Sequence, residues 1–119
     1  MSTAVYNHIK LDYLDLMSDG DPDMKKTMLE MLLAELPEEF AKMRSLSDQS
    51  NWEELGNVSH KMKSTLAFVG NDEMTNSNKK LELLAKNASE TELISGLIEI
   101  LESKLKEVML ELEEEFKSL

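Results

Sequence analysis

The residues best suited to chemistry are two histidines, in a chain of 119 residues that has no cysteine. One of them, His60, lies in the segment SHKMKSTLAFVG (residues 59–70), where one lysine follows it directly and another follows two residues later. A neutral imidazole is a nucleophile at physiological pH, and ammonium groups neutralise a phosphoryl group as point charges. Lys61 and Lys63 therefore suit the handling of a phosphoryl group beside His60, whereas His8 has no comparable surroundings and is expected to be a surface or packing residue.

A helix through this segment, at about 100° per residue, directs His60 away from the apolar side. The apolar stripe consists of residues at spacings of three and four: Trp52, Leu55, Ser59, Met62, Leu66 and Val69. The neighbours of His60 on the helix surface are mostly small: Gly56, Lys63, Ser64 and Ala67. Lys61 and Lys63 project on opposite sides of it. We therefore expect an exposed imidazole that a bulky partner can reach.

The segment resembles the motif of the histidine-containing phosphotransfer (HPt) domain family, approximately His-x-x-Lys-Gly-Ser/Ala with a glycine ten residues past the histidine. The matching positions are His60, Lys61, Lys63, Ala67 and Gly70, and Met62 and Val69 match in hydrophobic character. Ser64 stands where the family most often has glycine, a departure that keeps the side chain small. The expected helical layout extends the resemblance over nearly the whole chain.

The resemblance implies a phosphorelay function. His60 would accept a phosphoryl group from the aspartyl phosphate of a receiver domain and pass it to another receiver, while Lys61 and Lys63 neutralise its charge. The partners would be response-regulator receivers, a hybrid sensor histidine kinase, or both. The receiver would supply magnesium, so no cofactor of the protein's own is expected. Because no glycine-rich phosphate loop is present, the protein is expected to be a phosphocarrier without an ATP site rather than an enzyme. We expect partners to dock over five residues: Gly56, Ser64, Ala67, Phe68 and Gly70.

The chain as a whole favours an all-α fold, because the 3.6-residue period recurs and only four glycines and two prolines occur. Five helices are expected, over residues 8–17, 22–46, 52–69, 73–86 and 93–118. Pro37 predicts a kink or short break near Leu36, and residues 89–92 (SETE) have the form of a capping box before a last helix of about 43 Å. The short connections predict an up-down-up-down four-helix bundle with a short extra N-terminal helix, as a single domain over residues 1–119.

Composition and charge exclude several classes of protein. The net charge of −11 disfavours nucleic-acid and anionic-membrane surfaces. No segment predicts a secretory signal or a membrane span, so we expect a cytoplasmic protein, and a monomer, since one docking histidine requires no symmetry. The core-like spacing of Met24, Met28 and Met31 favours core packing over a copper site. A di-iron bundle is excluded because Glu-x-x-His pairs are missing, and no metal site is expected.

Two alternatives remain open from the residues alone. The first is a helical adaptor whose long acidic last helix binds a partner and in which His60 has no chemical role. The second is an HPt-like bundle that docks receivers without relaying phosphate. The adaptor accounts for the amphipathic helices, but it leaves the clustering of lysines and small residues around His60 unexplained.

Overall fold

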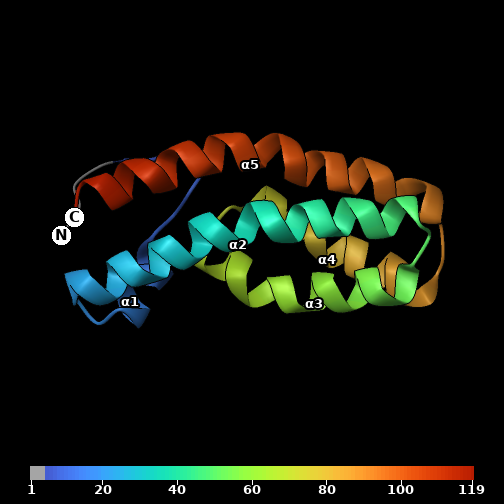
Figure 1. The fold of residues 1–119 in the computed structure, drawn as a ribbon, viewed down its shortest axis with the longest axis horizontal. Coiled ribbons are helices and arrows are strands. Elements are labelled where there is room, and N and C mark those ends of the chain that lie inside the picture. The colour runs from blue at the N-terminus through green and yellow to red at the C-terminus, as the bar shows by residue number, and fades with distance from the viewer. Residues whose placement is uncertain (1–4) are drawn as a thin grey trace.

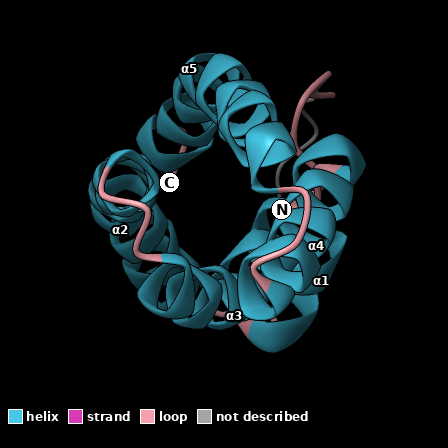
Figure 2. Cartoon of the chain, turned by 90° about the vertical axis from the view of Figure 1, so that its right-hand side faces the viewer, coloured by secondary structure: helices cyan, strands magenta, loops and turns pink. Residues whose placement is uncertain are grey.

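Five α-helices and one short 3-10 helix follow one another along residues 5–119, the part of the chain that the computed structural model describes. They are α1 (Asp12–Met17), α2 (Pro22–Asp48), α3 (Trp52–Val69), α4 (Asp72–Asn87), η1 (Thr91–Leu93) and α5 (Ile94–Lys117). The four long helices form a ring in which α2 and α4 each lie between α3 and α5 (Figure 1 and Figure 2). The described residues contain no strand, and the predicted antiparallel bundle is confirmed. Residues 1–4 of the predicted single domain, which belong to the N-terminal segment expected to contain no secretory signal, lie outside the described part.

Local sequence signals set most of the helix ends. The side chain of Asp21 accepts hydrogen bonds from two backbone N–H groups of the first turn of α2, and Pro22 occupies the first helical position. Asn51 and Asn71 cap α3 and α4 in the same way. α3 ends at Gly70, whose φ of 72° is left-handed. The predicted bounds of α3 are confirmed, and those of α4 differ by one residue at each end.

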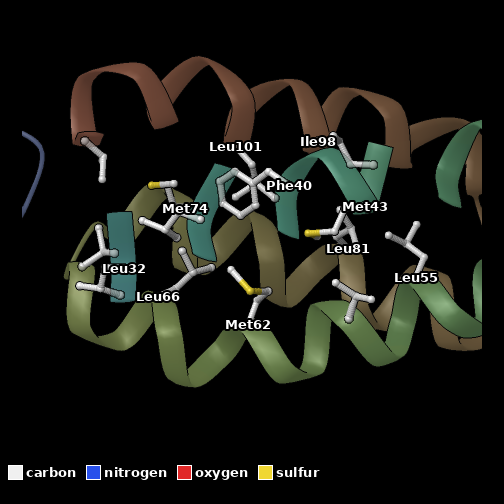
Figure 3. Packing of buried hydrophobic residues seen from close by; sticks show 14 of the residues in the cluster. Leu32, Phe40, Met43, Leu55, Met62, Leu66, Met74, Leu81, Ile98 and Leu101 are labelled. Atoms are coloured by element: carbon white, nitrogen blue, oxygen red, sulfur yellow. The ribbon is translucent and has the colours of Figure 1, made fainter. Parts of the chain in front are cut away.

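The core is built from the inner faces of all four long helices. Figure 3 shows their side chains pointing toward one another, with Phe40 of α2, Met62 of α3, Leu81 of α4 and Leu101 of α5 among them. The predicted stripe of α3 is confirmed, since its members are buried except Trp52, which is half-buried. The opposite side of α3 is therefore left to solvent.

Three methionines of α2, Met24, Met28 and Met31, do not form its core face as predicted. Met24 and Met31 are exposed and Met28 is half-buried. The buried stripe passes instead through Lys25, Leu29, Leu32, Leu36, Phe40, Met43 and Leu46. Lys25 is only 6% exposed, and its Nζ lies 2.6 Å from Asp15 Oδ1 and 2.7 Å from Glu115 Oε2. Because Lys25 is charged but occupies a core position, the spacing of the apolar residues did not predict this part of the core face correctly.

The first helix is shorter than predicted, since it begins at Asp12 rather than at residue 8. Glu111 of α5 accepts hydrogen bonds from three successive backbone N–H groups, those of residues 7–9, at 2.8–3.1 Å. These long-range bonds fix the segment as irregular backbone against α5. A contact across about a hundred positions of sequence leaves no local signal that would have ended the helix.

Pro37 does not break α2, which is continuous from Pro22 to Asp48. Proline removes one backbone donor from a helix interior, and this alone predicted the break. Pro37 is exposed, whereas Leu36 and Phe40 on either side of it are buried in the core. The packing of both halves holds the helix together across the missing hydrogen bond.

The predicted capping box before the last helix is also wrong. Ser89 and Glu92 make no capping hydrogen bond; η1 begins at Thr91, and α5 begins at Ile94. The backbone N–H of Ser89 instead donates to the carbonyl of Leu84, which closes the end of α4. Ser89 therefore ends one helix rather than starting the next, and α5 is about 36 Å long.

Gly70 holds the N-terminal segment against the end of α3, which leads to a prediction about stability. A Cβ at this position would clash with the carbonyl oxygen of Lys10, on a backbone with positive φ. Gly20 has a similar φ of 74° but nothing within 4 Å of a Cβ. We expect Gly70→Ala to lower the free energy of unfolding by roughly 3 kcal/mol and Gly20→Ala by about 1 kcal/mol, as measured by urea unfolding. Equal losses would show that the contact with Lys10 is unimportant.

Candidate functional site

His60 lies on the solvent side of α3, as predicted, with 61% of its side chain exposed. Its Nδ1 atom is 2.7 Å from Oε2 of Glu82 on α4. The other histidine, His8, is 29% exposed, and its Nδ1 lies 3.4 Å from Oε2 of Glu107. The His60 side chain is therefore more exposed to solvent than that of His8, and its Nδ1 is closer to a carboxylate oxygen.

Glu82 is a buried carboxylate shared by three donors. Besides the imidazole, Lys63 Nζ lies 3.1 Å from Oε1 and Lys86 Nζ lies 2.7 Å from Oε2. Burial opposes the charged form, but the hydrogen bonds from Lys86, Lys63 and His60 outweigh it and lower the pKa of Glu82 to about 2. Glu82 is therefore an anion at physiological pH.

The ionised carboxylate determines which ring nitrogen of His60 is free. A carboxylate anion only accepts hydrogen bonds, so the 2.7 Å contact requires a proton on Nδ1. In a neutral imidazole the other nitrogen, Nε2, then has the lone pair. Because the ring is bound at its Nδ1 edge and the side chain is mostly exposed, Nε2 is the atom available as a nucleophile.

The register of α3 against α4 brings Glu82 to His60. Ser59 and Asn78, both buried, form a reciprocal pair: Ser59 Oγ lies 2.7 Å from Asn78 Oδ1, and Asn78 Nδ2 donates to the Ser59 carbonyl at 3.0 Å. Buried polar groups tolerate few alternative pairings. This pair therefore prevents one helix from sliding along the other. Glu82 is one turn beyond Asn78, beside His60.

Gly56 was expected on the docking surface, but it packs against α4 instead. It is buried, and a Cβ there would lie 3.1 Å from Cγ of Lys86. The glycine lets α3 and α4 pack closely at this point. Gly70 likewise lies against Lys10 rather than facing a partner.

The two lysines next to His60 lie on opposite sides of α3, as predicted. Lys63 reaches α4 through Glu82, whereas Lys61 points to α2, where its Nζ is 3.7 Å from Oε1 of Glu39. Both side chains are at least half exposed. Only Lys63 is thus in contact with a group that touches the imidazole.

The surface beyond His60 toward the C-terminal end of α3 is small and then apolar. Ser64 and Ala67 are exposed, and Phe68 stacks on Tyr13 of α1 with ring centroids 5.2 Å apart. Phe68 also lines a shallow groove between α2 and α3, together with Met28, Met31, Leu32, Glu35 and Thr65. Met28 and Met31, which were expected in the core, therefore line this groove beside α3.

Glu82, Lys86 and Asn78 were missed by sequence reasoning. Glu82 and Lys86 form an i,i+4 pair that is common on solvated helix faces, so the pair alone did not indicate a buried site. Asn78 has no local signal, because its partner is on another helix. Residues 5–119 contain no group of three or more His, Asp or Glu side chains placed to hold a metal ion. None of the helices described is long and apolar enough to cross a membrane.

The fold and the site together define a helical bundle that presents a carboxylate-anchored histidine to solvent. A family model for the Hpt domain matches residues 27–116, and the chain belongs to the Hpt domain family. Hpt domains are phosphocarrier modules of histidine phosphotransfer in two-component systems, not catalysts. Comparison with curated proteins and with solved structures gave no match.

Proposed function

We propose that this protein is a phosphorelay intermediate in which His60 accepts a phosphoryl group from a receiver aspartate and passes it to another receiver. The observation that supports this most directly is the bond between Nδ1 and Glu82, which leaves Nε2 as the exposed nucleophile. Phosphoryl transfer depends mainly on positioning and on charge neutralisation. An anchored imidazole with lysines beside it meets both needs.

The receiver supplies the remaining parts of the reaction, including magnesium and the in-line carboxylate. The protein itself then requires no cofactor and no ATP. Its partners are response-regulator receivers, a hybrid sensor histidine kinase, or both, and it works as a monomeric single domain in the cytoplasm.

The receiver docks over the α2–α3 face, which we define as Ser64, Ala67, Phe68, Met28 and Met31. Exposed small residues border His60, and an apolar groove continues from them. Flexible methionine side chains adapt to differently shaped partners, which suits a carrier with more than one receiver. Gly56 and Gly70 do not belong to this surface, since both pack against other parts of the chain.

The decisive experiment is incubation of the protein with a phosphorylated receiver, followed by analysis of the label that it takes up. Phosphohistidine is acid-labile and base-stable, whereas aspartyl phosphate is labile in base. We expect acid-labile, base-stable label on the protein, and its loss when a second, unphosphorylated receiver is added. A stable complex with receivers but no label would favour a docking adaptor.

The flanking lysines are expected to speed transfer by neutralising the phosphoryl group. Replacing Lys61 and Lys63 by alanine should slow transfer about tenfold, which corresponds to exposed charge contacts worth about 1.4 kcal/mol together. Lys63→Ala should slow transfer more than Lys61→Ala does, because Lys63 contacts the carboxylate that holds the imidazole. Rates are measured at low salt and again at high salt, where the difference should shrink.

The matched control for the lysines is Lys106→Ala, which removes an exposed lysine from α5. It changes the net charge by the same amount as Lys63→Ala alone but lies on the other side of the bundle. If Lys106→Ala slowed transfer as much as Lys63→Ala does, the net charge of the protein, and not the position of the lysine beside His60, would govern transfer.

A further inference from the structure

We propose that Glu82 acts in the return step, by keeping Nδ1 of phosphorylated His60 protonated so that transfer to a receiver expels neutral imidazole. This inference rests on the proposed phosphorylation of His60 at Nε2. It assigns Glu82 the role of a positioning residue, since the carboxylate acts through the imidazole and does not touch the phosphoryl group.

The return step breaks the bond between Nε2 and phosphorus and forms a bond from phosphorus to a carboxylate oxygen of the receiver aspartate. The electron pair of the broken bond goes to Nε2. With a proton on Nδ1 the departing ring is a neutral imidazole; without that proton it departs as an imidazolate anion. Imidazolate is a far stronger base and so a far poorer leaving group. The protonation of Nδ1 therefore decides how readily the phosphoryl group leaves.

The geometry around Nδ1 favours its protonated form. Glu82 Oε2 lies 2.7 Å away on a side chain that is only 8% exposed, so water does not readily replace the carboxylate. A directly bonded anion in such a place favours the protonated partner. Ser59 and Asn78 fix the helix register that brings the carboxylate there.

The other charged groups near this pair belong to α2, α3 and α4. α3 contributes Lys63, and α4 contributes Lys86; both contact Glu82 and both disfavour a proton on Nδ1. On α2, Glu39 pairs with Lys61, and Glu35 accepts a hydrogen bond from Thr65. Within the described chain, no ion pair joins α1 or α5 to His60, Lys63, Glu82 or Lys86. Without the charge of Glu82, the cations Lys63 and Lys86 would remain near Nδ1. Nδ1 would then lose its proton at a lower pH.

The test uses Glu82→Gln, because the amide oxygen still accepts the Nδ1 hydrogen bond but has no charge. The 119-residue chain is phosphorylated on His60 with phosphoramidate, a small-molecule donor, and is mixed with one magnesium-loaded receiver between about pH 5.5 and pH 9. The ratio of unmodified to variant transfer rate is measured at each pH, which cancels the receiver's own pH dependence. The ratio should be close to one in acid, where solvent protonates both proteins. It should rise by about tenfold per pH unit once Nδ1 of the variant loses its proton.

A control variant and a second measurement complete the design. Glu73→Gln also neutralises a lysine-paired glutamate of α4, and its ratio should stay near one at every pH. Nitrogen NMR of the unmodified phosphorylated protein needs no variant to fold. It should show Nδ1 of phosphorylated His60 titrating at higher pH than in an unfolded phosphohistidine peptide. A ratio that does not change with pH, or an Nδ1 titration at or below that of the peptide, overturns the role of Glu82 alone. Absence of label on His60 of the unmodified protein overturns the proposed function, and this inference with it.

Discussion

His60→Gln is expected to abolish phosphoryl acceptance and to leave the fold intact. A glutamine amide has no nucleophilic lone pair comparable to that of imidazole, so labelling should fall to background, a loss of at least about a thousandfold. The side chain of His60 is 61% exposed and belongs to no core contact. Glutamine is a good helix former and can donate a hydrogen bond to Glu82, so the free energy of unfolding should change by no more than ~0.5 kcal/mol.

The matched control is His8→Gln, which removes the other histidine. Its imidazole is 29% exposed and contacts Glu107 at 3.4 Å, away from the lysines of α3. Label transferred from a phosphorylated receiver should be unchanged in this variant. Thermal unfolding followed by circular dichroism shows that both variants are folded. If the two variants took up equal label, the assignment of the acceptor to His60 would be wrong.

The helix that bears the acceptor was predictable because its signals are local. The apolar stripe of α3, its Asn51 cap and its left-handed Gly70 all lie within the helix or one residue from it. The stripe alone directs His60 to solvent, and the motif adds the lysines. The same locality explains why the start of α2 at Pro22 was predicted correctly.

Features that depend on two helices at once were not predictable. The Glu82 carboxylate faces His60 only because Ser59 pairs with Asn78 across the interface and Gly56 lets α4 approach. These contacts fix the register between helices, and a single helical period contains no information about it. Met24, Met28 and Met31 were wrongly assigned to the core of α2 for a related reason, since Lys25 is buried through ion pairs with other helices.

Ser64→Leu is expected to slow transfer by about a hundredfold while the helical bundle remains folded. Ser64 is exposed and lies one turn beyond His60 on the same side of α3, within the proposed docking face. A receiver carboxylate must come nearly in line with Nε2, and a displacement of about 1 Å can cost ~100-fold in rate. Leucine adds a bulky side chain at this approach without disfavouring a helix. Transfer is measured with a phosphorylated receiver, and folding by thermal denaturation.

Two further variants distinguish a blocked approach to His60 from a change in the stability of the fold. Ser103→Leu makes the same change at an exposed position of α5, which lies across the ring from α3 (Figure 2), and should leave transfer unchanged. Ser64→Gly opens the approach and should keep or raise the rate, at a cost of up to about 1 kcal/mol in helix stability. Transfer by Ser64→Leu at the unmodified rate would remove the α2–α3 face from the docking surface. The receiver would then have to approach His60 from the side of Lys63 and Lys86, where Glu82 already holds both cations.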